Sequence, residues 1–211
     1  RVLFRSVGWY CRTMAEAMGR SGDYCERIFL ASPLHDIGKV GIPDGILLKP
    51  GRLDAREWDL MRRHCDIGAA ILGAGADAPG GDALRWLIAN GPAVDNPFLD
   101  MAETIARAHH ENWDGSGYPR GLAGETIPLE ARLVTVADTY DALISARPYK
   151  MPMPHAAAVA IMDAEAPRRF DPEVYRIFKE GLERIRDIAA RLTDENMDAS
   201  ADGGPGRGKE D

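Results

Sequence analysis

The histidines of this chain stand in places that could bind metal. There are five, and His35 is followed directly by Asp36, while His109 and His110 are adjacent. A fourth, His64, precedes a cysteine. A single histidine is usually a hydrogen-bonded or surface side chain, but paired ligand types among so few histidines indicate a metal site. Imidazole nitrogens with carboxylate oxygens suit Fe, Mn, Co, Ni or Zn.

Asp138 is the acid that best completes such a site. It follows the apolar run 133–137, and a buried carboxylate is costly unless it is paired or binds a metal. An aspartate can also bridge two ions about 3.5–4 Å apart, as in two-metal sites that cleave phosphodiesters. We therefore predict a two-metal phosphodiester hydrolase centre. Its predicted ligands are His35, Asp36, His64, His109, His110 and Asp138.

The segments that must position these residues read as helices joined by loops rich in glycine and proline. Predicted helices cover residues 7–18, 23–36, 54–72, 83–89, 98–110, 129–145, 154–164 and 172–192. Asp54 and Glu57 have capping-box spacing, and Asp171 is a good N-cap before a proline. Pro33 and Gly38 predict a break beside the first His-Asp pair. The fold class is all-α, a compact multi-helix bundle with the metal site in its core and an irregular loop over residues 112–128.

Composition and charge exclude several function classes. A net charge of −7 argues against broad nucleic-acid binding, so neither DNA nor RNA is an expected partner. No run of about 20 apolar residues is present, so no membrane segment is predicted. The three cysteines contain no C-x-x-C pair, which favours a reduced, cytoplasmic location.

Several ordered motifs resemble the HD-GYP family, a branch of the HD phosphohydrolase superfamily. The resemblance runs from about residue 7 to residue 178, and the run from His109 to Pro119, which contains Gly-Tyr-Pro, is its most specific part. The matching pieces are residues 35–39, 42–44, 48–51, 64 with 67–68, 109–119, 136–138 with 141–143, 147–150 and 170–172.

This resemblance implies hydrolysis of the bacterial second messenger cyclic di-GMP to pGpG, and in some cases onward to GMP. It implies that the six ligands hold two divalent metal ions, with Asp36 bridging, and it favours Fe or Mn over Ni, Co or Zn. Catalytic roles fall on Asp36 and Lys39. The residues implied in substrate binding are Lys39, Tyr118, Arg147 and Lys150.

The resemblance also implies an organisation. Residues 1–192 would be the cytoplasmic output domain of a bacterial two-component signalling protein, and residues 193–211 a flexible polar tail. An N-terminal regulatory domain is expected, because the chain starts at Arg1 and reads as a fragment. A homodimer or a GGDEF-type partner is a further expectation. Residues 73–96 read as an insertion.

A third metal site is not expected from these residues. Family members that have one use a glutamate and a histidine on the first helix. In one alignment register the histidine position falls at Leu3, and in the other both positions precede the chain. A binuclear site is therefore favoured over a trinuclear one.

Two other functions stay open at this point. One is a phosphohydrolase of the same superfamily that acts on another nucleotide or phosphate ester. The other is a non-catalytic module that binds a cyclic dinucleotide or a partner protein, although the intact ligand set argues against it.

Overall fold

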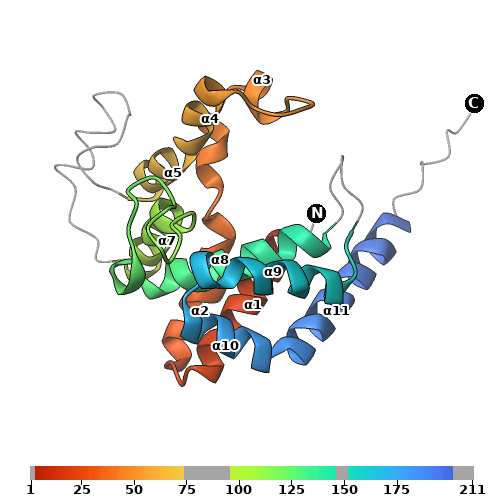
Figure 1. The fold of residues 1–211 in the computed structure, drawn as a ribbon. Helices are drawn as coiled ribbons and strands as arrows, with labels where there is room; N and C mark the ends of the chain where they lie inside the picture. The colour runs from red at the N-terminus through yellow and green to blue at the C-terminus, as the bar shows by residue number, and fades with distance from the viewer. Residues whose placement is uncertain (1–2, 74–95, 146–151, 202–211) are drawn as a thin grey trace, which may run out of the picture.

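The computed structural model describes residues 3–73, 96–145 and 152–201, with side chains described from residue 6 to residue 192. Within these ranges the chain forms helices and no strand, which confirms the all-α prediction (Figure 1). The α-helices are α1 Leu3–Ala17, α2 Gly22–Ala31, α3 Asp44–Leu47, α4 Ala55–Arg62, α5 His64–Leu72, α7 Pro97–Ala108, α8 Leu129–Ile144, α9 His155–Arg169, α10 Pro172–Glu180 and α11 Leu182–Ala201. Short 3-10 helices are η1 Ser32–Leu34, η2 Ile37–Gly41 and η3 Gly124–Thr126.

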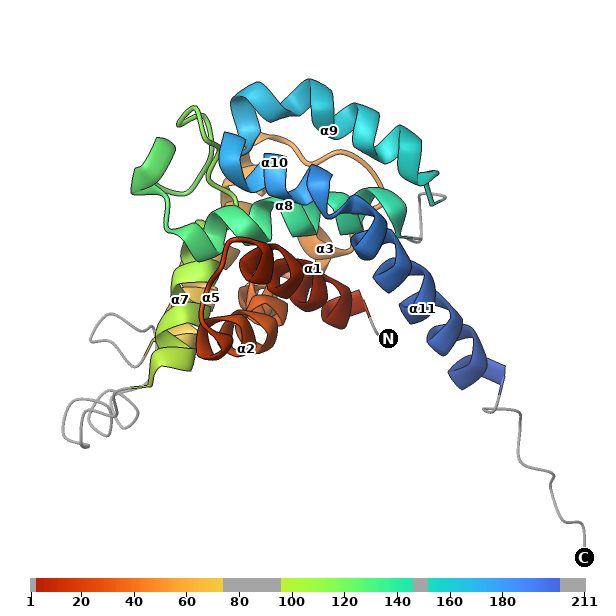
Figure 2. The ribbon, with the colours of Figure 1, turned by 90° about the horizontal axis from the view of Figure 1, so that it is seen from below.

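Helices α1 and α8 lie side by side in the centre of the bundle, and the other long helices pack around them (Figure 2). On α1, Tyr10 and Met14 recur at helical spacing and are buried, so this face enters the core. Tyr140 of α8 meets Tyr10 edge-on, with ring centroids 5.6 Å apart. The Phe178 ring of α10 packs on the Tyr140 ring, with centroids 5.2 Å apart. This packing holds α8, which carries Asp138, against the bundle.

The predicted break beside the first His-Asp pair is confirmed. Helix α2 ends at Ala31, and the chain continues through η1 and η2, with His35 and Asp36 between them. The Ser21 hydroxyl caps α2 by accepting from the Tyr24 amide, so the helix begins at Gly22, one residue before the predicted start at residue 23. The short turns let His35 and Asp36 point away from a regular helical surface.

Gly38 allows the closest approach between η2 and α5. A Cβ at this position would lie 1.9 Å from the carbonyl oxygen of His64 and 2.4 Å from the amide of Gly68. Only a residue without a side chain fits there, and the contact brings the backbone of the first His-Asp pair against that of His64.

The predicted helix 54–72 is two helices. The capping box at Asp54 and Glu57 is present, as predicted. The helix ends at Arg62, however, and α5 begins at His64, so the prediction that His64 lies in mid-helix is wrong. His64 is the first residue of α5 and is 1% exposed.

The C-terminal half follows its predicted helices with three differences. The helix from 154 continues through Pro167 to Arg169 rather than ending at 164. Gly181 separates α10 from α11 inside the predicted helix 172–192. Helix α11 runs to Ala201, past the predicted helix end at residue 192, so residues 193–201 are helical. The division into a domain over 1–192 and a flexible tail over 193–211 stays a prediction. The remainder of the tail and nearly all of the insertion 73–96 lie outside the described residues.

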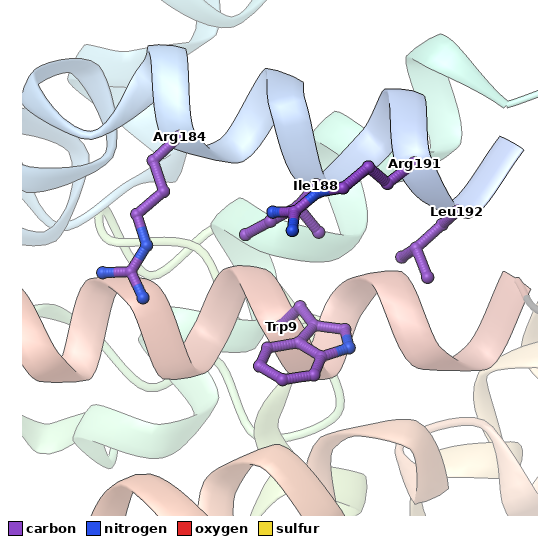
Figure 3. A pocket seen from close by; sticks show the side chains of 5 residues that line it. All are labelled: Trp9, Arg184, Ile188, Arg191 and Leu192. Carbon is purple, nitrogen blue, oxygen red and sulfur yellow. The ribbon is translucent and has the colours of Figure 1, made fainter. Parts of the chain in front are cut away.

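A hollow of about 300 Å³ separates α11 from α1. Trp9 of α1 faces Arg184, Ile188, Arg191 and Leu192 of α11 across it (Figure 3). It is lined by none of the predicted metal ligands. Among the described helices, none combines the length and apolarity needed to cross a membrane.

Candidate metal centre

Four side chains from three parts of the chain form one cluster. Asp36 precedes η2, His64 begins α5, and His109 and His110 follow α7. One ligand atom from each lies within 4.8 Å of the others. The His64 and His109 residues are 1% and 2% exposed, so two of these ligands are removed from water.

Backbone carbonyls orient three of the histidine rings. The Nδ1 atoms of His35, His64 and His109 lie 2.7, 2.8 and 3.1 Å from carbonyl oxygens. A carbonyl only accepts, so each Nδ1 carries the proton, and in the neutral rings of His64 and His109 the lone pair of Nε2 points the other way. This is the usual outer contact of a metal-binding histidine. The carbonyls belong to Ser32, Met61 and Ile105.

Asp36 lies where these Nε2 atoms converge. Its Oδ1 is 3.5 Å from Nε2 of His64 and 3.8 Å from Nε2 of His109, while its Oδ2 is 3.4 Å from Nε2 of His35. Neither Asp36 Oδ1 nor His109 Nε2 has a hydrogen-bond partner, although both atoms are buried. Acceptor atoms that face one another in a buried site fit a cation between them. The donor set, imidazole with carboxylate, fits divalent transition metals.

Protonation also favours metal binding here. Burial lowers the pKa of His110 to about 3 and that of His109 well below its ordinary value, and it lowers the pKa of His64 as well. These three rings are therefore neutral near pH 7 and can act as ligands. Burial would likewise lower the pKa of His35, but its hydrogen bond to Asp36 and the charge of Asp138 raise it by more.

Asp36 itself is ionised. Burial would raise its pKa, but the hydrogen bond and charge of His35 and the charge of Lys39 lower it well below its ordinary value. The Lys39 ammonium lies 2.5 Å from Asp36 Oδ2. The predicted catalytic lysine is thus in direct contact with the predicted bridging carboxylate.

Asp138 approaches the same nitrogen of His35 as Asp36 does. Its Oδ1 is 3.6 Å from Nε2 of His35, and its side chain is 26% exposed, half-buried rather than fully buried as its position in the apolar run suggested. The four-residue cluster does not include His35 and Asp138, but His35 adjoins it through Asp36, and Asp138 adjoins it through His35. All six predicted ligands thus lie in one connected group.

The glycine-rich loop after His110 folds back over the cluster. The Tyr118 ring stacks on the His110 ring, with centroids 4.7 Å apart and planes 27° apart. The amide of Tyr118 donates to the carbonyl of His110 at 3.2 Å. Tyr118 therefore borders the site, as the resemblance implied.

Glu111 anchors this loop, a role that the sequence motifs alone did not reveal. It is 1% exposed, and its two oxygens accept from the amides of Arg120 and Leu122 at 2.8 and 3.1 Å. A glutamate next to two histidines could be read as another ligand. The sequence feature that could have indicated the anchoring role is the position of Glu111 before several glycines, because a glycine-rich segment needs an anchoring contact to be ordered. Thr135 adds a second anchor, because its hydroxyl donates to the His109 carbonyl at 2.8 Å.

Two predicted substrate-binding residues, Arg147 and Lys150, lie outside the described residues. Their roles stay predictions. The expectation that the first helix provides no ligands for a third metal also stays a prediction, because the side chain of Leu3 is not among those described.

Comparisons with known proteins find a matching family and several relatives of this chain. The family model of the HD domain matches residues 92–174. A cyclic di-GMP phosphodiesterase of Thermotoga maritima is 40% identical over 97% of this chain and 51% of its own length. The cyclic di-GMP phosphodiesterase response regulator RpfG of Xanthomonas campestris is 41% identical over 85% of this chain and 43% of its own.

A related specificity also appears among the relatives. The 3'3'-cGAMP-specific phosphodiesterase 2 of Vibrio cholerae is 38% identical over 89% of this chain and 32% of its own length. The chain spans about half or less of the length of these curated relatives.

Proposed function

The chain belongs to the HD-GYP branch of the HD domain family, and from this premise we propose that it is a metal-dependent phosphodiesterase that hydrolyses cyclic di-GMP to pGpG. The observation that carries the proposal is the convergence of neutral His64 and His109 nitrogens on the ionised carboxylate of Asp36. Relatives named for this activity match nearly the whole chain.

Two divalent ions are proposed, with Asp36 bridging and with ligands from His35, His64, His109, His110 and Asp138. Ions held there would supply positive charge to polarise a phosphodiester and to activate water for in-line attack. Mixed imidazole and carboxylate ligands suit Fe, Mn, Co, Ni or Zn, and among these Fe or Mn is proposed because the resemblance to the HD-GYP family favours them. No third ion is proposed.

The protein's own residues supply orientation and charge. The carbonyl contacts orient the rings of His35, His64 and His109 before substrate arrives. The Lys39 ammonium pairs with the Asp36 carboxylate. With cations at Asp36, the Lys39 ammonium is free to contact a phosphate oxygen, and Tyr118 borders the space in which the substrate lies.

A second candidate substrate is 3'3'-cGAMP, favoured by the 38% identical relative named for that specificity. Both nucleotides present the same phosphodiester to the metals and differ in one purine. We also propose that the chain is the cytoplasmic output domain of a longer bacterial signalling protein, supported by its coverage of about half of the Thermotoga relative.

The test is an assay of purified protein loaded anaerobically with Fe or Mn. Cyclic di-GMP and 3'3'-cGAMP are supplied separately, and the products are resolved by chromatography. We expect pGpG from the first, with GMP showing whether a second cleavage occurs. Turnover of another nucleotide with none of cyclic di-GMP would reject the proposed substrate, and binding without any turnover would favour a non-catalytic module.

A further inference from the structure

A guanidinium lies one aromatic ring away from the histidine cluster. The Cζ atom of Arg62 lies 5.5 Å from the centroid of the Tyr118 ring, whose stacking partner is His110. Arg62 is the last residue of α4, and only one residue separates it from His64. Backbone connection and ring contact both tie this cation to the rim of the metal centre.

The contact leaves the guanidinium open to a ligand. The Arg62 side chain is 50% exposed, and its ion pair with Asp59 spans 4.0 Å between groups that are 50% and 77% exposed. Such a surface pair contributes little and is easily exchanged. The Tyr118 ring contacts the planar guanidinium by a cation–π interaction, and half of the Arg62 side chain stays exposed. Arg62 is therefore oriented without being neutralised.

A cyclic dinucleotide needs a cation in such a place. It has two phosphodiesters in one ring, and only the scissile one can lie on the metals at a given time. The chain carries a net charge of −7, so the second phosphate needs a local positive group. The planar guanidinium of arginine can donate two parallel hydrogen bonds to two phosphate oxygens. A lysine ammonium acts as a point charge and recognises a phosphate less specifically.

We propose that Arg62 is a further substrate-binding residue, which holds the non-scissile phosphate of the cyclic dinucleotide beside Tyr118. This inference rests on the proposed function. It adds a binding residue from the end of α4 to the predicted Lys39, Tyr118, Arg147 and Lys150.

The test compares two substrates in the metal-loaded enzyme. Bis(p-nitrophenyl) phosphate has a single phosphodiester and no second phosphate. In Arg62→Gln we expect KM for cyclic di-GMP to rise roughly ten- to a hundredfold, the usual cost of losing a hydrogen bond to a charged group. Hydrolysis of the small diester and the metal content should stay within about twofold. Arg56→Gln removes the same charge from the exposed first turn of α4 and should leave both substrates unaffected.

The outcomes separate this inference from the proposed function. If the unaltered enzyme hydrolyses only the small diester, the proposed substrate fails whatever Arg62 does. If cyclic di-GMP is hydrolysed and Arg62→Gln leaves its KM unchanged, the Arg62 assignment is wrong. Equal losses on both substrates would show that Arg62 acts on the metal centre through Tyr118. Competition by cyclic di-AMP, which has the same phosphates and sugars but different substituents on its purines, should weaken as much as binding of cyclic di-GMP. Loss confined to the guanine nucleotide would overturn the phosphate assignment.

Discussion

Replacing Glu111 by glutamine tests how the Gly-Tyr-Pro loop is held against the cluster. The carboxylate accepts two backbone amides, from Arg120 and Leu122, in a site that is 1% exposed. Glutamine keeps one oxygen, but it turns an NH2 group toward the other amide, so one bond is lost and two donors face each other. Hydrogen bonds to charged groups contribute about 1.5–3 kcal/mol, so we expect the loop to be destabilised by about 2–3 kcal/mol.

Amide hydrogen exchange measures this cost where it arises. A loss of 2–3 kcal/mol corresponds to a fall in protection of roughly 30- to 150-fold at the amides of Arg120 and Leu122. Turnover should fall because the loop also carries Tyr118, while metal content should be retained because the ligand histidines are held by other contacts. Glu125→Gln, an exposed change in the same loop, is the matched control. Unchanged protection at both amides in Glu111→Gln would refute the anchoring role.

Three further predictions concern the framework and its protons. Asp171→Ala should lower the free energy of unfolding, measured in urea, by about 3–5 kcal/mol, because Asp171 caps α10 and pairs with Arg132 at 2.5 Å. The Asp171 side chain is 6% exposed and the Arg132 side chain 17%. A loss under 1 kcal/mol would contradict this. Gly38→Ala should lower the free energy of unfolding by about 3 kcal/mol and weaken metal binding, because the new Cβ would meet the His64 carbonyl. The control Gly45→Ala, with nothing within 4 Å of its Cβ, should leave the free energy of unfolding unchanged. Equal effects of the two variants in urea and metal titrations would refute the packing argument. Below the raised pKa of His35, metal affinity should fall by up to about tenfold per pH unit, since the metal must displace the proton of the His35 ring. His110, with a pKa lowered to about 3, stays neutral over this range. Equal metal affinities in titrations at pH 6 and pH 8 would be inconsistent with ligation by His35.

The sequence predicted most of the helices because their signals are local. The capping box at Asp54 and Glu57 and the cap at Asp171 are present as predicted. The break after Ala31 followed from Pro33 and Gly38. These signals depend on residues a few positions apart, so the rest of the fold does not alter them.

The errors arise where a tertiary contact decides the structure. No proline or glycine in the sequence indicates the helix break between Arg62 and His64. The break occurs where Gly38 packs closely on the His64 carbonyl. The anchoring by Glu111 joins residues nine and eleven positions apart, a separation that no helix or strand period marks. Pattern reasoning therefore identified which residues could form the site but not what holds them in place.

The most direct test measures metal content and turnover on the same sample. Anaerobically prepared protein is titrated with Fe or Mn, and elemental analysis is paired with hydrolysis of cyclic di-GMP for the unaltered chain, His109→Ala and Asp138→Asn. The account predicts that turnover peaks at about two ions per chain. Both variants should lose turnover while circular dichroism shows unchanged helix content. Full turnover with less than about one ion per chain, or unchanged activity in both variants, would contradict it.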